Sequence, residues 1–134
     1  ERLVKIVCRA ITLTSIDFGV ICGLRTMKEQ EGLVKAGLSQ TLASKHIDGL
    51  AVDLMAYVDG RGCWELSVYD DIADAMKKAA TEEGVAIRWG AAWNIDDIRA
   101  WDGTMEQAMN HYIDARRLTG RRPFIDGPHF ELMD

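Results

Sequence analysis

Apolar residues recur at helical spacing in three segments of this chain. The first covers residues 3–14, with a stripe formed by Leu3, Val7, Ala10 and Ile11 and with Ile6 and Leu13 alongside. The second covers about 67–83, with an inner face of Ile72, Ala75, Met76 and Ala79. The third opens on the capping box of Thr104 and Gln107, and one side carries Met105, Ala108, Met109 and Tyr112. Residues three and four apart share one face of a helix, so we expect three helices that each bury one side.

Short apolar runs predict strands at 18–22, 50–58, 85–89 and 130–132. Residues 59–62, Asp-Gly-Arg-Gly, are expected to end the second run. Thr26 and Glu29 form a further capping box, and the helix that it opens should stop at Gly37 before a loop over 38–48. The order of helices and strands is mixed rather than regularly alternating. We therefore predict an α+β fold with a mainly antiparallel sheet flanked by helices.

Composition narrows the class of protein. The chain has 134 residues, of which 48% are hydrophobic and 28% charged, so we expect one globular domain over 1–134. No apolar run is long enough to span a membrane. The net charge of −5 argues against general nucleic-acid binding, which requires a basic surface. The cysteines Cys8, Cys22 and Cys63 show no disulfide or zinc-ribbon spacing, and we expect small buried side chains.

Candidate chemistry begins at the second predicted strand. His46 lies just before this strand, and Asp53 lies inside its apolar run, seven residues later. A carboxylate buried there requires a partner, because an unpaired buried charge is costly. A bound cation is one such partner, and an arginine or a hydroxyl is the alternative. Gly49 allows the chain to bend sharply between the two residues.

A second imidazole lies near the C-terminus, between two acids. Asp126 precedes His129 by three residues, and Glu131 follows it by two. Two imidazoles, one carboxylate ligand and a further acid are the components of a catalytic zinc site. Either Asp126 or Glu131 could be the base, since residues two apart in a strand share a face. We expect the third histidine, His111, to be a solvated residue of its helix.

These segments together resemble the M15 family of zinc peptidases, which cut bacterial peptidoglycan. The family signature SxHxxGxAxD is filled by Ser44, His46, Gly49, Ala51 and Asp53, and the downstream acid-x-x-His is filled by Asp126 and His129. Residues 23–26, Gly-Leu-Arg-Thr, are similar to the family's G-x-R-[ST]. The similarity runs from about residue 3 to 132. It is strongest to phage endolysins of the L-alanyl-D-glutamate peptidase type, with the D-alanyl-D-alanine carboxypeptidases as more distant members.

The resemblance implies a ligand set and a base. It implies that His46, Asp53 and His129 bind Zn²⁺ and that Asp126 is the catalytic acid/base. Glu131 then becomes a structural acid that could orient a ligand histidine. The fold implied is that of the hedgehog and D-Ala-D-Ala peptidases.

Three further residues are assigned to the substrate. The resemblance implies that Arg25 faces the substrate and stabilises the oxyanion, and that Ser44 helps to bind the peptide. Arg25 follows a glycine turn just before a helix N-terminus, a place suited to anions, although a surface salt bridge is the alternative. We assign Trp93 to the wall of the cleft.

Two departures from the family pattern stand out. Residues 89–93, Trp-Gly-Ala-Ala-Trp, match the family's W-G-G-D-W only in part, with Ala92 in place of an acid. The segment at about 94–123 is longer than usual and is interpreted as an insertion that could form one wall of the cleft. It carries the basic group Arg116, Arg117, Arg121 and Arg122. This group is either a solvated helix end or a contact for carboxylates of peptidoglycan.

The leading functional hypothesis is a zinc metallopeptidase of phage lysis that hydrolyses the L-Ala–D-Glu bond of the stem peptide. One alternative is a D-alanyl-D-alanine carboxypeptidase. A second is a zinc-stabilised binding module without turnover, although such a module has no need of Asp126. We expect a monomer that binds the stem peptide of peptidoglycan. With no recognisable signal peptide, it would be made in the host cytoplasm and would reach the wall through a holin-type partner.

Overall fold

The structure is a computed structural model that describes residues 2–22, 27–36 and 49–133. Four α-helices occur in this part of the chain: α1 (Arg2–Leu13), α2 (Met27–Lys35), α3 (Leu66–Glu83) and α4 (Met105–Leu118). The strands are β1 (Asp17–Cys22), β2 (Ala51–Val58), β3 (Arg61–Cys63), β4 (Ile87–Trp89) and β5 (His129–Leu132). A short 3₁₀ helix, η1, covers Ile98–Ala100.

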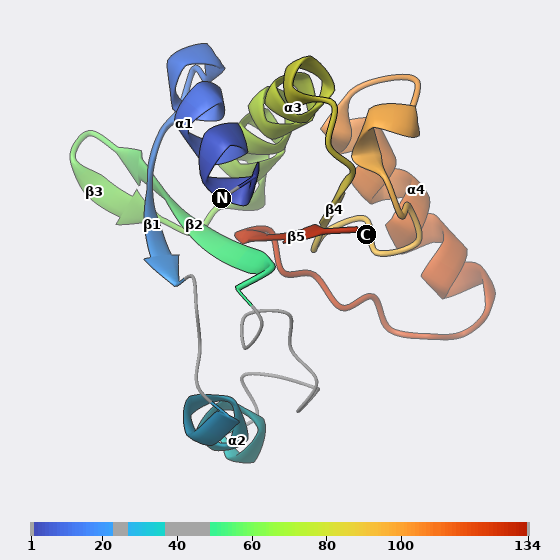
Figure 1. Cartoon of the computed structure of the whole chain (residues 1–134). Helices are drawn as coiled ribbons and strands as arrows, with labels where there is room; N and C mark the ends of the chain where they lie inside the picture. Colours follow the sequence, from blue (N-terminus) through green and yellow to red (C-terminus); the bar gives the residue numbers. More distant parts are fainter. Residues whose placement is uncertain (1, 23–26, 37–48, 134) are drawn as a thin grey trace.

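The strands form one antiparallel sheet in the order β1-β2-β5-β4, with β3 also paired to β2 (Figure 1). β2 is the longest strand in the described residues, and it pairs with β5 through its first three residues and with β3 through its last three. The last strand of the chain is therefore inserted between β2 and β4. This arrangement confirms the predicted α+β class and its antiparallel sheet, and it brings the two candidate ligand segments together.

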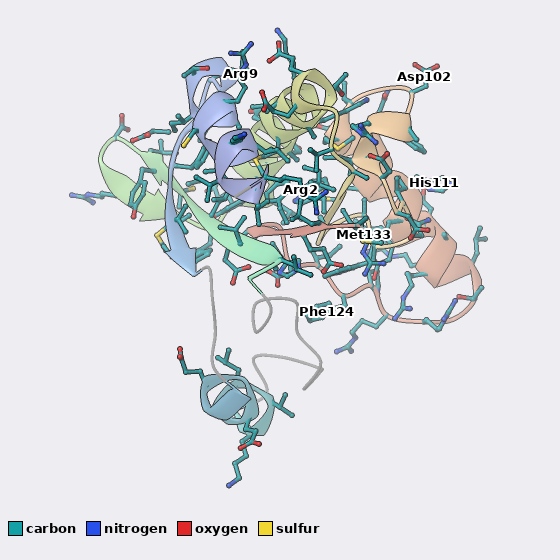
Figure 2. All side chains as sticks on the ribbon, in the orientation of Figure 1. Arg2, Arg9, Asp102, His111, Phe124 and Met133 are labelled. Carbon is teal, nitrogen blue, oxygen red and sulfur yellow. The ribbon has the colours of Figure 1, made fainter. Side chains whose placement is uncertain are left out.

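Helices α1 and α3 lie together over one face of the sheet, and α4 packs beside α3 (Figure 1). Their inward side chains meet those of the sheet in one core, which Figure 2 shows as a dense layer of sticks between helices and strands. The largest fully buried members include Ile6, Leu54, Ile72, Trp89 and Phe130. The sheet that carries the candidate residues is thus backed by a continuous apolar layer, and burial of this kind is the main stabilising term in folding.

Segment 94–123 is fastened to α3 at the start of α4. Thr104 accepts a hydrogen bond from the Gln107 backbone, and the Gln107 side chain accepts one from the Thr104 backbone, so the predicted capping box is present. Asp74 of α3 accepts a hydrogen bond from the Met105 N–H at 2.8 Å. Burial raises the pKa of Asp74, and this hydrogen bond acts in the opposite direction. The helix in this segment therefore has a fixed position against the core.

The first helix buries most of the predicted apolar stripe but not its last residue. Leu3, Ile6 and Ala10 are its buried residues, whereas Ile11 is 40% exposed. The prediction is confirmed for Leu3 and Ala10, and for Ile6 alongside them, but it is wrong for Ile11. Sequence spacing fixes the width of a face but not which edge of it meets the core.

Residues 59–62 end the second predicted strand, as expected, since β2 stops at Val58. The sequence analysis did not predict that a new strand begins within them. Asp59 and Gly60 both have positive φ, of 53° and 76°, as in a two-residue type I′ turn. The chain therefore reverses at once, and Arg61–Cys63 returns along β2 as β3.

The cysteine prediction fails for the two side chains that the structure describes. Cys8 is exposed on α1 and Cys63 is half-buried, so neither is a core residue. No helix in the described ranges is both long enough and apolar enough to cross a membrane.

Candidate metal centre

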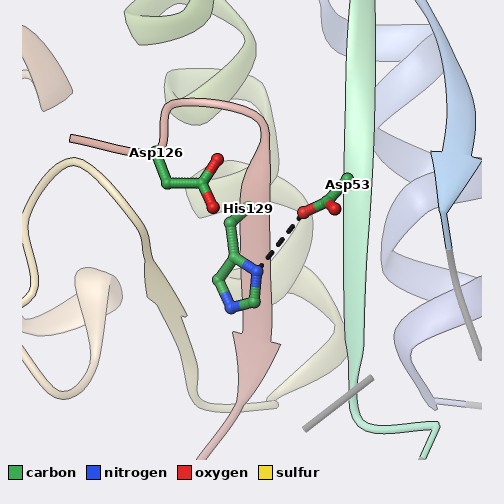
Figure 3. A group of neighbouring side chains, drawn as sticks. All are labelled: Asp53, Asp126 and His129. Carbon is green, nitrogen blue, oxygen red and sulfur yellow. Dashed lines mark ion pairs between the residues drawn. The ribbon is translucent and has the colours of Figure 1, made fainter. Parts of the chain in front are cut away.

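Strand pairing places Asp53 of β2 directly opposite His129 of β5. The Oδ1 atom of Asp53 lies 3.3 Å from Nδ1 of His129, and the two side chains are only 16% and 9% exposed. Figure 3 shows the carboxyl groups of Asp53 and Asp126 turned toward the His129 ring. The buried carboxylate singled out in the sequence therefore has the imidazole of the distant motif as a neighbour.

Asp126 joins this pair from the turn that leads into β5. One ligand atom from each of Asp53, Asp126 and His129 lies within 4.8 Å of the others. The backbone N–H of His129 donates to the Asp126 carbonyl at 3.0 Å, which closes the turn. The spacing of three residues thus places the carboxyl group of Asp126 beside the imidazole.

Residues 89–90, at the end of β4, hold this turn in place. Gly90 accepts a hydrogen bond from the Asp126 N–H and donates one to the His129 carbonyl, each at 2.8 Å. A side chain at Gly90 would collide with the Asp126 carbonyl oxygen and would press on Cβ of His129. The indole N–H of Trp89 donates to the Gly127 carbonyl at 2.7 Å. Of the three positions of the family's W-G-G-D-W that this chain keeps, Trp89 and Gly90 therefore support the backbone of the site.

The second ring nitrogen of His129 is also engaged. Nε2 lies 2.8 Å from Oε1 of Glu131, and Oε2 of Glu131 accepts a hydrogen bond from Arg88 at 2.8 Å. Arg88 lies opposite Glu131 in the β4–β5 pairing, and its guanidinium lies over the Trp93 ring at 5.2 Å. The family resemblance made Glu131 an acid that could orient a ligand histidine, whereas Arg88 was not predicted. The one feature of the sequence that could have indicated Arg88 is its position between two inward apolar residues of a short strand.

These contacts set the protonation of the site in the absence of a metal. Burial alone would lower the pKa of His129, but the hydrogen bonds to Asp53 and Glu131 outweigh it and raise this pKa to about 9. Burial would raise the pKa of Glu131, but the hydrogen bond to His129 and the charge of Arg88 lower it to about 2. An imidazolium between carboxylates is thus the stable form, and the same carboxylates favour any cation in its place.

The donor set fits a divalent metal ion such as Zn²⁺, which binds imidazole nitrogen and carboxylate oxygen. Because Nε2 of His129 faces Glu131, Nδ1 on the Asp53 side is the nitrogen available to a metal. A histidine ligand whose other nitrogen bonds a carboxylate is the usual arrangement in metalloproteins. Asp53 and His129, two of the three predicted ligands, therefore fit the predicted metal, with Asp126 beside them.

Trp93 forms a wall beside this group. Its ring centroid lies 5.3 Å from that of His129 and 6.2 Å from that of Phe124, with which it stacks. Ala92, at the position where the family pattern has an acid, is fully buried.

The other predicted site residues, Arg25, Ser44 and His46, lie outside the residues that the structure describes. Gly49, the first residue after that gap, has φ of 69°, which agrees with the predicted sharp bend before β2. His111 is exposed on α4, as expected, and its ring lies 5.2 Å from that of Trp101.

Comparisons with a family model and with a curated protein both match this chain to one family. The family described as phage L-alanyl-D-glutamate peptidase matches residues 1–133. The L-alanyl-D-glutamate peptidase of Escherichia phage T5 is 33% identical over 136 residues, which cover 98% of this chain and 87% of that protein.

Solved structures point the same way. The crystal structure of the Serratia marcescens L-Ala D-Glu endopeptidase ChiX is 34% identical with a TM-score of 0.70, over 97% of this chain and 77% of that one. The vancomycin-resistance D,D-dipeptidase VanXYg matches 98% of this chain and 47% of its own, at 20% identity and a TM-score of 0.50. The second likeness supports the expected D-Ala-D-Ala peptidase-like fold alone.

Proposed function

This chain belongs to the phage L-alanyl-D-glutamate peptidase family, and from that premise we propose that it is a zinc endopeptidase that hydrolyses the L-Ala–D-Glu bond of peptidoglycan stem peptides. The observation that carries the proposal is the convergence of Asp53, Asp126 and His129 within 4.8 Å, at the junction of β2 and β5. Two acids and one imidazole from distant segments provide both ligands and a base.

The ligands that we propose are Asp53, His129 and, from the family motif, His46. A zinc ion bound there would polarise the scissile carbonyl and lower the pKa of water. Glu131 holds the His129 ring with Nδ1 toward Asp53, and Arg88 balances the charge of Glu131.

Asp126 is the proposed general acid/base. Its side chain is half-buried beside His129, and its backbone is fixed by Gly90. It would accept a proton from the attacking water and return it to the leaving amine. Arg25 would stabilise the oxyanion, Ser44 would bind the peptide, and Trp93 would form the cleft wall.

Digestion of purified muropeptides tests the reaction. With zinc present, mass spectrometry should show peptides that begin with D-Glu and glycan fragments that end in L-Ala. A chelator should abolish both products, and added zinc should restore them. Loss of a single terminal D-Ala would instead identify a carboxypeptidase. A zinc-loaded protein that releases no product would be a binding module.

The setting of this reaction is also a proposal. We propose that the protein acts as a monomer at the bacterial cell wall, after synthesis in the host cytoplasm and release by a holin-type partner. Size-exclusion chromatography with light scattering measures the oligomeric state directly.

A further inference from the structure

A cavity of about 250 Å³ lies between the start of segment 94–123 and the last turns of α4. It is lined by Trp93, Asn94, Tyr112, Ala115, Arg116 and Arg121. Sites for a whole drug-sized ligand occupy roughly 300–1,000 Å³. This cavity is therefore suited to one side chain or functional group rather than to an entire peptide.

Hydrogen bonds from α4 to the returning chain hold the wall of the cavity. The Tyr112 hydroxyl donates to the carbonyl of Phe124 and accepts a hydrogen bond from its N–H, at 3.3 and 3.2 Å. The Arg116 guanidinium donates to the Arg122 carbonyl at 3.0 and 3.2 Å. Figure 1 shows this returning segment passing from the end of α4 to β5. The cavity is thus framed by fixed elements on both sides.

The lining is cationic. Neither Arg116 nor Arg121 pairs with a carboxylate anywhere in the part of the chain that the structure describes, and no lining residue is acidic. Arg116 uses Nε and Nη2 for the Arg122 carbonyl, and Arg121 uses Nε for the Thr119 hydroxyl. A guanidinium has five N–H donors, so each retains donors for a ligand. Such donors favour a carboxylate or phosphate.

The cavity adjoins the metal centre through one side chain. Trp93 lines the cavity, and its ring also packs against His129 at 5.3 Å between centroids. A group bound in the cavity would therefore be separated from His129 by the Trp93 ring alone. For a peptide cleaved there, that group belongs to a residue at or next to the scissile bond.

We propose that this cavity is a specificity subsite for the free carboxylate of the D-Glu residue. The inference rests on the proposed function, because it takes the substrate from it. A glutamate within a peptide uses one carboxyl group in the chain and leaves the other free. That carboxylate is the anion nearest to an L-Ala–D-Glu bond, and Arg121 and Arg116 supply the complementary charge.

Two peptides test the chemistry of recognition. One contains L-Ala–D-Glu with the free carboxylate, and the other carries a neutral carboxamide in its place. The wild-type protein should cleave both, with a KM about tenfold higher for the amide, because charge-assisted hydrogen bonds to arginine are lost. The value of kcat should be similar for the two peptides, since the group lies outside the reacting bond.

Two variants locate the effect. Arg121→Gln should raise KM for the acid peptide to near that for the amide, and should leave the amide peptide unaffected. Arg117→Gln is the matched control, because Arg117 is exposed in the same stretch of chain but does not line the cavity. The control should keep the full preference for the acid peptide.

The outcomes separate the subsite from the reaction. Equal KM for both peptides with wild-type protein, or equal effects of Arg121→Gln and Arg117→Gln, would overturn the subsite while the peptidase function stands. Failure of the wild-type protein to cleave either peptide would overturn the proposed function and the subsite with it.

Discussion

At the scale of single residues, the His129 side chain is held by three neighbours. Asp53 lies against one ring nitrogen and Glu131 against the other, and the ring packs on Trp93. Both the direction of the ring and its available nitrogen are therefore fixed before any metal binds. Such preorganisation is what a metal site requires of the residues around its ligands.

Replacement of Glu131 tests this orientation. Glu131→Gln keeps the shape of the side chain but removes the charge that favours a proton on Nε2 of His129. We expect zinc affinity to fall by roughly 10- to 100-fold, the range seen for such outer residues. Competition with a chromophoric chelator measures it. Glu106→Gln, on the exposed face of α4, is the control, and an equal affinity in both variants would contradict the proposed role.

Alanine substitutions should distinguish the metal ligand, Asp53, from the general base, Asp126. Asp126→Ala should keep zinc and fold but lose most turnover, because only proton transfer is removed. Asp53→Ala should lose zinc as well. Metal analysis and muropeptide digestion of the same preparations measure both properties. Asp102→Ala, at an exposed site, should behave as wild type. Retained turnover in Asp126→Ala would refute the assignment of the base.

Local sequence singled out Asp53 and His129, because an acid in an apolar run and a histidine beside a turn are visible in one dimension. The choice of Asp126 over Glu131 came from the family resemblance. The convergence of Asp53, Asp126 and His129 was expected and is present. The pairing of Arg88 with Glu131 was not predicted, because it depends on the register of β4 against β5. Register is set by long-range pairing and is absent from local sequence.

At the scale of elements, the turn from Asp126 to His129 depends on its neighbour β4. Gly90 lies so close to this turn that a Cβ atom has no room there. The position therefore requires glycine for close approach rather than for an unusual φ.

Gly90→Ala should displace the turn and weaken the fold. We expect the free energy of unfolding to fall by about 1–3 kcal/mol, as for other overpacked core sites. The affinity for zinc should fall by a larger fraction than the free energy of unfolding. Urea denaturation with and without zinc measures both. Gly32→Ala is the control: a Cβ there meets open space in α2, and alanine favours helix, so stability should stay equal or rise. Unchanged zinc binding in Gly90→Ala would show that the turn tolerates the shift.

The helices were the most predictable elements, because caps and periodicity are local. The capping box at Thr104 and the helix end at Gly84, with φ of 69°, both follow from residue type. The hairpin at Asp59-Gly60 also carried a local signal, an Asp-Gly pair, but the three-residue strand after it is too short for a period to be seen.

At the scale of the whole molecule, the metal centre links stability to pH. In the metal-free protein the pKa of His129 lies at about 9, above its ordinary value of 6.5. The folded state therefore holds this proton more tightly than the unfolded state. The stabilisation is complete below about pH 6.5 and is lost as the pH rises toward 9.

We expect the free energy of unfolding of the chelated protein to fall by roughly 3 kcal/mol between pH 6 and pH 9.5, at 1.36 kcal/mol per pKa unit. Denaturation curves at several pH values measure it. His129→Gln removes the titrating group and should flatten this dependence. Zinc should stabilise the protein more strongly as the pH rises over the same range, because it no longer competes with the proton. A parallel fall in both proteins would assign the effect to other groups.

The most direct test of the account is a crystal structure of the zinc-loaded protein with anomalous scattering measured at the zinc edge. The account predicts one strong peak about 2.0–2.2 Å from Nδ1 of His129 and from a carboxylate oxygen of Asp53, with Asp126 beside it. An anomalous map with no peak between β2 and β5 would contradict it. So would a metal bound to Nε2 of His129, the nitrogen that contacts Glu131 in this structure.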